Sequence, residues 1–113
     1  MNITKQEALR LIDERPDLFS GIERHIVRQF KRWLHNNEHV LQAFEKYAIE
    51  LKRRGNREYY SIMCIMQRLR WDSLLRQEGG KWKLNNNYCP VIARILMALN
   101  AELRNMFQLR NRY

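Results

Sequence analysis

Hydrophobic positions recur with a helical period along most of the chain, so the pattern predicts four or five helices. The residues T-K-Q-E at positions 4–7 have the form of a capping box and begin a helix that must end before Pro16. A second capping box, S-G-I-E at positions 20–23, predicts the start of the next helix. Further helices are expected over residues 38–54, where Gly55 suits a left-handed C-terminal position, and over residues 61–71.

The pattern changes after residue 71. Residues 74–77 predict a short strand, Gly79 and Gly80 a turn, and residues 81–84 a returning strand with its lysines in solvent. The asparagines that follow lead into a last helix, which begins near Asn87 or Cys89 and whose apolar stripe continues to residue 107. The order helix, turn, helix, hairpin is typical of a winged helix-turn-helix.

These elements predict a mainly α fold of four to five helices with a short β-hairpin, resembling a winged helix-turn-helix. A chain of 113 residues with 45% hydrophobic residues favours one domain. We expect residues 1–36 to form N-terminal helices, and residues 37–113 the helix-turn-helix, the hairpin and the C-terminal helix. A helical bundle with a solvated hairpin is the simpler alternative.

Charge is distributed unevenly along the chain, whose formal net charge is +9. Residues 1–50 hold eight basic and eight acidic residues, whereas residues 51–113 hold thirteen basic and four acidic residues. Such asymmetry favours an acidic partner, which is a nucleic acid, a membrane surface or an acidic protein. The predicted nucleic-acid contacts are the polar residues beside the turn, the second helix and the hairpin: Arg53, Arg54, Arg57, Gln67, Arg68, Arg70, Lys81, Lys83, Asn85 and Asn86.

A second basic face is expected on the helix that follows residue 20. Its cationic side is formed by Arg24, Arg28, Lys31, Arg32 and His35, opposite an apolar stripe. This face is either a solvated surface or one that contacts phosphates.

The helix over residues 61–71 also has an unusual outer face. Its helical projection places Met63, Cys64, Gln67 and Trp71 opposite the inner stripe, so that one glutamine stands among apolar groups. A surface that reads DNA bases usually offers more polar side chains. Met63, Cys64 and Trp71 are therefore predicted protein-interaction residues, for a partner or for a homodimer.

No sequence motif indicates an enzyme, a metal or another cofactor. The residues H-N-N-E-H at 35–39 match a zinc-peptidase pattern, but the adjacent asparagines are typical of a helix junction. The two cysteines have no metal-binding spacing and are expected to be buried thiols in a reducing compartment. The chain shows neither a membrane-spanning run nor a signal peptide, so a cytoplasmic location and no membrane partner are expected.

Three short motifs carry a resemblance to a known family. The residues R-L-R-W at 68–71, K-L-N-N-N-Y at 83–88 and A-R at 93–94 resemble a family of small uncharacterised proteins encoded by bacteriophages and prophages. The resemblance covers about residues 38–110. It implies a viral or prophage origin and action in the cytoplasm of a bacterial host cell, and it carries no known activity.

Two functions follow from these observations as hypotheses. The first is non-enzymatic DNA binding, in which basic residues of the C-terminal part contact phosphates. The second is a phage-encoded inhibitor or adaptor that docks on an acidic or nucleic-acid-binding host protein, for example a host defence complex, through a basic and apolar surface.

Overall fold

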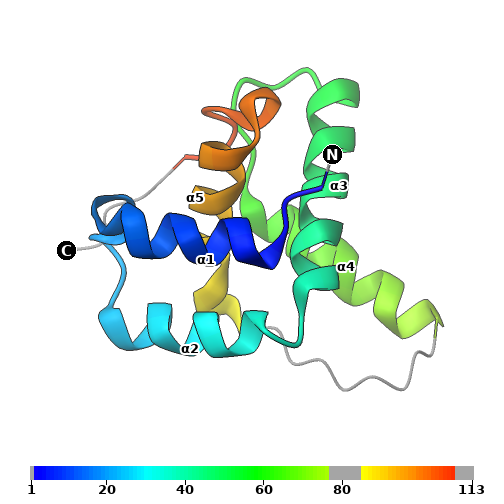
Figure 1. Cartoon of the computed structure of the whole chain (residues 1–113). Coiled ribbons are helices and arrows are strands. Elements are labelled where there is room, and N and C mark those ends of the chain that lie inside the picture. Colours follow the sequence, from blue (N-terminus) through cyan, green and yellow to red (C-terminus); the bar gives the residue numbers. More distant parts are fainter. Residues whose placement is uncertain (1, 77–84, 109–113) are drawn as a thin grey trace.

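The computed structural model describes residues 2–76 and 85–108, which are mainly helical (Figure 1). Within these residues there are five α-helices and three short 3₁₀ helices. In chain order they are α1 (Lys5–Glu14), η1 (Pro16–Phe19), α2 (Arg24–Leu34), α3 (Glu38–Arg54), α4 (Ile62–Arg76), η2 (Asn86–Tyr88), α5 (Cys89–Leu99) and η3 (Ala101–Leu103).

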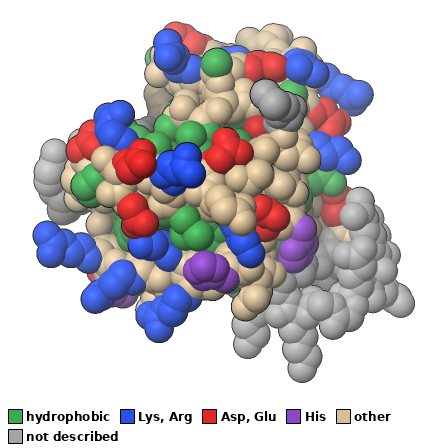
Figure 2. Space-filling view, in the orientation of Figure 1, with side chains coloured by type: hydrophobic (Ala, Val, Ile, Leu, Met, Phe, Trp, Pro, Cys, Tyr) green, Lys and Arg blue, Asp and Glu red, His purple; other side chains and the backbone are tan. Residues whose placement is uncertain are grey.

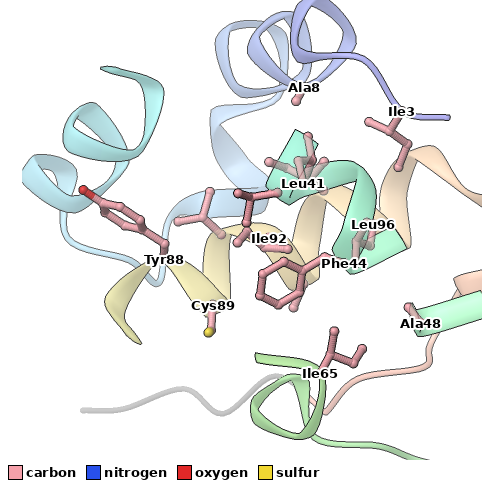
Figure 3. Close-up of a cluster of buried hydrophobic side chains, with 14 of the residues drawn as sticks. Ile3, Ala8, Leu41, Phe44, Ala48, Ile65, Tyr88, Cys89, Ile92 and Leu96 are labelled. Atoms are coloured by element: carbon pink, nitrogen blue, oxygen red, sulfur yellow. The ribbon is translucent and has the colours of Figure 1, made fainter. Parts of the chain in front are cut away.

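The helix α5 lies at the centre of the core. It packs against α1, α3 and α4, and its buried side chains alternate with those of α3 and α4 in the close-up of the core (Figure 3). Ile92, Ile95 and Leu96 of α5 are fully buried, as is Phe44 of α3. Burial of such aliphatic and aromatic groups supplies the main favourable free energy of folding. The α2 helix joins this core through Tyr88, whose ring lies 5.6 Å from Phe30 and 5.4 Å from Trp33 between centroids.

The N-terminal helix begins as its sequence predicts. The Thr4 hydroxyl accepts from the Glu7 amide and the Glu7 carboxylate accepts from the Thr4 amide, which confirms the capping box. Two carboxylates of α3 hold this end of the chain in place. Glu38 accepts from the Lys5 amide at 2.7 Å, and the buried Glu45 accepts from the Ile3 amide at 2.7 Å.

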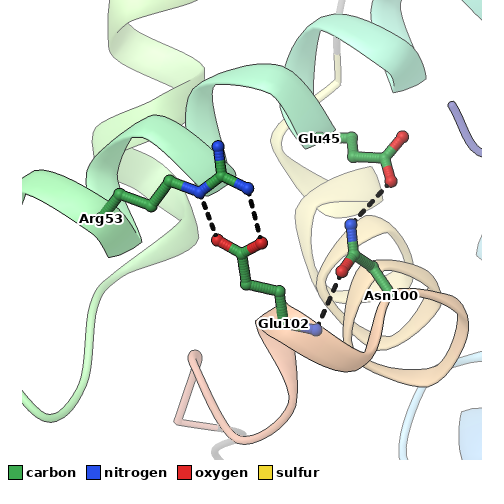
Figure 4. A network of polar contacts seen from close by, with 4 residues as sticks. All are labelled: Glu45, Arg53, Asn100 and Glu102. Carbon is green, nitrogen blue, oxygen red and sulfur yellow. Dashed lines mark hydrogen bonds and ion pairs between the residues drawn. The ribbon is translucent and has the colours of Figure 1, made fainter. Parts of the chain in front are cut away.

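A polar network continues from Glu45 to the end of α5 (Figure 4). The Asn100 side-chain NH₂ donates to Glu45 at 2.9 Å, and the Asn100 side-chain Oδ1 accepts from the Glu102 backbone amide. Asn100 thereby ends α5 and starts η3. The predicted long C-terminal helix therefore stops at Leu99, although Leu103, Met106 and Phe107 are buried as their spacing suggested.

The predicted β-hairpin is wrong, and with it the winged helix-turn-helix. Residues 74–76 continue α4 to Arg76, and the residues that the structure describes contain no strand, only an isolated bridge between Tyr60 and Phe107. The sequence L-L-R at 74–76 consists of strong helix formers, so local propensity extends the helix beyond Asp72 and Ser73. The remaining hairpin positions, residues 77–84, lie outside the described residues.

Two helix-end predictions are also corrected. The S-G-I-E segment caps no helix, because Ser20 closes η1 in a helical conformation and α2 begins only at Arg24. Gly55 ends α3 in an extended conformation with φ −82° rather than a left-handed one. Its need for glycine is steric, since a Cβ there would lie 1.8 Å from the Tyr60 hydroxyl oxygen.

Candidate nucleic-acid interface

The outward face of α4 carries an exposed tryptophan. Ile65, Met66 and Leu69 are buried against α3 and α5, so the opposite side of the helix faces solvent. Cys64, Gln67 and Trp71 lie on this outward side, and Trp71 is 62% exposed. Since three apolar residues face the core and Trp71 points away from it, packing does not explain the indole. We name Cys64, Gln67 and Trp71 the α4 outward face.

One flank of this face is formed with α3. The Arg68 guanidinium lies 4.5 Å from the centre of the Tyr47 ring, a cation–π geometry. Glu50 lies 3.4 Å from Arg54 and 3.7 Å from Arg68, so one carboxylate serves two cations. The Tyr47 hydroxyl donates to Asp72 at 2.5 Å and holds the aromatic ring in place. On this flank the charges of Arg54 and Arg68 are balanced by those of Glu50 and Asp72, so guanidinium groups lie near Trp71 without a net positive charge.

The other flank joins two motifs that are distant in the sequence. The Arg70 guanidinium donates to the side-chain Oδ1 of Asn86 at 2.8 Å. Asn85 accepts from the Asn87 amide and starts η2, at whose end Tyr88 is buried. The N-N-N-Y segment is thus a structural connection from α4 to α2, and its first two asparagines remain exposed next to Arg70.

The predicted nucleic-acid residues separate into distinct places. Gln67, Arg68 and Arg70 are all exposed on α4, with the two arginines on opposite flanks, and Glu50 pairs with both Arg54 and Arg68. Arg53 instead forms a two-pronged ion pair with Glu102 at 2.7 and 2.9 Å (Figure 4), which raises the pKa of Arg53. Arg57 is exposed in the loop before α4. Lys81 and Lys83 lie outside the described residues.

The predicted protein-interaction residues differ in exposure. Trp71 and Cys64 are exposed, whereas Met63 is half-buried and packs against the core. The expectation that both cysteines are buried is wrong for Cys64, because its position on the helix points it away from α3 and α5. Cys89 is buried, and desolvation raises the pKa of its thiol to about 11.

Sequence reasoning missed Tyr47 and Glu50. The helical pattern of residues 38–54 gives no sign that either side chain contacts another helix. In the structure they also orient Arg68 of the neighbouring helix. The i,i+3 spacing of an aromatic and an acidic residue gave a weak signal, but the partner on α4 depends on how the two helices pack.

Other chemical sites are sparse in the part of the chain that the structure describes. No three His, Cys, Asp or Glu side chains there gather in a way that could hold a metal ion. Glu38 of the H-N-N-E-H segment is engaged by the Lys5 amide, and the His35 carbonyl oxygen accepts from the Lys5 ammonium. None of the described helices has the length and apolar character needed to cross a bilayer.

An open depression elsewhere on the molecule is lined by basic and acidic residues together with apolar ones. It lies near the end of α3 and the loops at residues 58–59 and 104–107, and it contains Lys52, Glu58, Tyr59, Met97, Arg104, Asn105 and Phe107. No cluster of groups there indicates a reaction.

Comparisons with protein-family models, with curated proteins and with solved structures give no match for this chain.

Proposed function

We propose that this protein is a non-enzymatic DNA-binding protein that contacts a strand with unpaired bases through the α4 outward face. The observation that carries the proposal is the exposure of Trp71 between arginines on both flanks, Arg68 on the α3 side and Arg70 on the Asn86 side. The proposal requires no wing and no recognition helix in a major groove.

The chemistry of this face suits a single strand. Every base has a π-face that can stack on an exposed indole, and such stacking contributes about 1–3 kcal/mol per base. Guanidinium groups on either side can form charge-assisted hydrogen bonds with the phosphates of the same strand. Gln67 is the only amide of the α4 outward face that could reach a base edge, so we expect weak sequence preference.

The total charge supports the same partner. Residues 51–113, which contain α4, hold thirteen basic and four acidic residues. Such a surplus attracts a polyanion over long range and makes the affinity depend on salt.

The test is a titration of labelled oligonucleotides, single-stranded and duplex, at two salt concentrations. Replacing Trp71 with alanine should weaken single-strand binding roughly 5- to 150-fold, the equivalent of 1–3 kcal/mol. Tyr59→Ala is the matched control, since Tyr59 is an exposed aromatic residue, 45% accessible, that precedes α4 and lines the depression with Lys52 and Arg104. Equal affinities for the Trp71 and Tyr59 variants, or binding that is indifferent to salt, would refute the proposal.

A second candidate function is docking on another protein, as the phage resemblance suggests. It is favoured by two exposed residues that are not polar, Cys64 and Trp71, together with the half-buried Met63 on the same helix. Tryptophan and arginine are also the residues most enriched in binding hot spots. The partner would be an acidic or nucleic-acid-binding host protein, or a second copy of the chain.

Cys64 provides a probe that separates the two functions. Because Cys89 is buried, a maleimide fluorophore should react with Cys64 alone in the folded protein. Protection of Cys64 by a single-stranded oligonucleotide supports DNA binding at this face. Protection that grows with protein concentration, and is unaffected by the oligonucleotide, supports docking with a second copy instead.

A further inference from the structure

We propose that α2 carries a second surface that binds the phosphate backbone of nucleic acid, formed by Arg24, Arg28 and Arg32. The three residues are exposed and follow one another at four-residue spacing, so they form a single stripe along the helix. With a rise of about 1.5 Å per residue, successive arginines start about 6 Å apart along the helix axis. We name these three residues the α2 arginine stripe.

The stripe is not neutralised by its surroundings. Between Arg24 and Leu34 the sequence has four cationic residues and no acidic one. The fourth cation, Lys31, is not part of the stripe and forms an ion pair with Asp13 of α1 at 2.7 Å. Within the described residues, no carboxylate forms an ion pair with Arg24, Arg28 or Arg32, whereas Arg53, Arg54 and Arg68 all have one.

Such an arrangement is unfavourable for the isolated protein. Like charges at four-residue spacing destabilise a helix. A bound polyanion removes this repulsion and releases counterions. The carboxylate that directly precedes the helix, Glu23, lies 3.2 Å from His25, and no ion pair joins it to an arginine of the stripe among the described residues.

The separation of acids from bases is visible on the surface (Figure 2). Lys and Arg side chains gather along the edge formed by α2, while Asp and Glu side chains lie over α1. The rest of residues 1–50 holds four basic and eight acidic residues, which offset the four cations of α2 in the total. The zero net charge of this half therefore conceals a basic surface.

The geometry favours nucleic acid over a membrane surface. A membrane-bound amphipathic helix inserts its apolar side into the bilayer. The apolar side of α2 is already used, because Phe30 is fully buried and Trp33 packs on Tyr88. What remains is a row of guanidinium groups, which pair with phosphate oxygens through parallel hydrogen bonds. This inference shares its partner with the proposed function but does not depend on Trp71.

The experiment compares two triple variants with the same loss of charge. The first is Arg24→Gln, Arg28→Gln and Arg32→Gln; the control is Lys46→Gln, Lys52→Gln and Arg104→Gln, three cations for which the described residues show no ion pair. Glutamine keeps helix propensity, and circular dichroism verifies that both variants fold. The association constant for a labelled oligonucleotide is measured across a salt series.

Loss of three phosphate contacts should reduce the slope of log affinity against log salt by about 2 to 3 units in the stripe variant. The control should keep nearly the wild-type slope. Trp71→Ala should weaken binding but leave the slope unchanged, so failure of the α4 proposal and failure of this one give different results. Equal slopes for the two triple variants would overturn the inference. The inference would also be overturned if the wild-type protein bound vesicles of equal parts phosphatidylcholine and phosphatidylserine more tightly than the oligonucleotide, and if the stripe variant lost this binding to vesicles.

Discussion

Glu45 is the most informative residue for testing how the core is closed. It is 2% exposed, and its carboxylate accepts from the Ile3 amide at 2.7 Å and from the Asn100 side chain at 2.9 Å. It thus ties the segment before α1 to the middle of α3. The bond to Asn100 ties the end of α5 to the same residue (Figure 4). Glu45→Ala removes both hydrogen bonds, whereas Glu45→Gln keeps the shape of the side chain.

The expected loss of stability depends on how far the two donors, the Ile3 amide and the Asn100 side chain, are left without a hydrogen-bond acceptor. The Ile3 amide is buried, so leaving it unpaired costs about 1–3 kcal/mol. The Asn100 amide is part-buried and loses about 0.5–1.5 kcal/mol. Relief of the buried charge offsets some of this cost, so Glu45→Ala should lower the free energy of unfolding by about 1–4 kcal/mol.

The free energy of unfolding of the Glu45→Gln variant should lie between those of the wild type and Glu45→Ala. Its carbonyl oxygen can still accept from Ile3, but its amide would face the amide of Asn100. The side-chain amide of Asn100 cannot flip to offer its oxygen to glutamine without losing a hydrogen bond, because its Oδ1 already accepts from the Glu102 backbone amide. We expect a cost of about 1–2 kcal/mol for Glu45→Gln.

The assay is urea unfolding followed by far-ultraviolet circular dichroism, supported by thermal melts. At about 4 °C per kcal/mol, Glu45→Ala should lower Tm by roughly 4–16 °C. Glu58→Ala, at an exposed acid in the loop after α3, is the control and should change stability by less than about 0.5 kcal/mol. If Glu45→Ala matches this control, or if glutamine destabilises more than alanine, the role assigned to the network is wrong.

Three further outcomes are expected. Gly55→Ala should destabilise the protein by about 1–3 kcal/mol in urea unfolding, because the new Cβ meets the Tyr60 hydroxyl and the backbone of α3; an unchanged midpoint would contradict the close approach. Tyr88→Ala should cost roughly 3 kcal/mol, since it removes the ring that joins α2 to the core, and a loss under 1 kcal/mol would argue against that contact. The pKa of Cys89 rises from its ordinary value near 9 to about 11, so its contribution is complete below pH 9 and is lost as pH rises toward 11; wild-type stability relative to Cys89→Ala should fall over that range.

Helix positions and the core were largely readable from the sequence. The apolar stripes of α3, α4 and α5 predict the side chains that are buried, such as Phe44, Ile65 and Leu96. The capping box at Thr4 also forms as predicted, because it depends only on residues three apart. These features are local, and hydrophobic period with capping chemistry is sufficient to specify them.

The prediction of a hairpin shows where local patterns fail. Asp72 and Ser73 interrupt the apolar stripe of α4, and such a break indicates either the end of the helix or a change of its packing face. Asp72 is instead paired with Tyr47 of α3, so tertiary contact satisfies the polar group while the helix continues to Arg76. No pattern within α4 itself could reveal that partner.

By itself, the sequence determined the mainly helical character, the apolar stripes that form the core and the total charge of +9. Only the tertiary structure decided which charges remain available. Packing brings Glu102 to Arg53 and Asp13 to Lys31, but it leaves the α2 arginine stripe without an acidic partner among the described residues. Packing also places Cys64 and Trp71 outward. The reason is physical: burial follows a local period, whereas neutralisation of a charge depends on distances between side chains far apart in the chain.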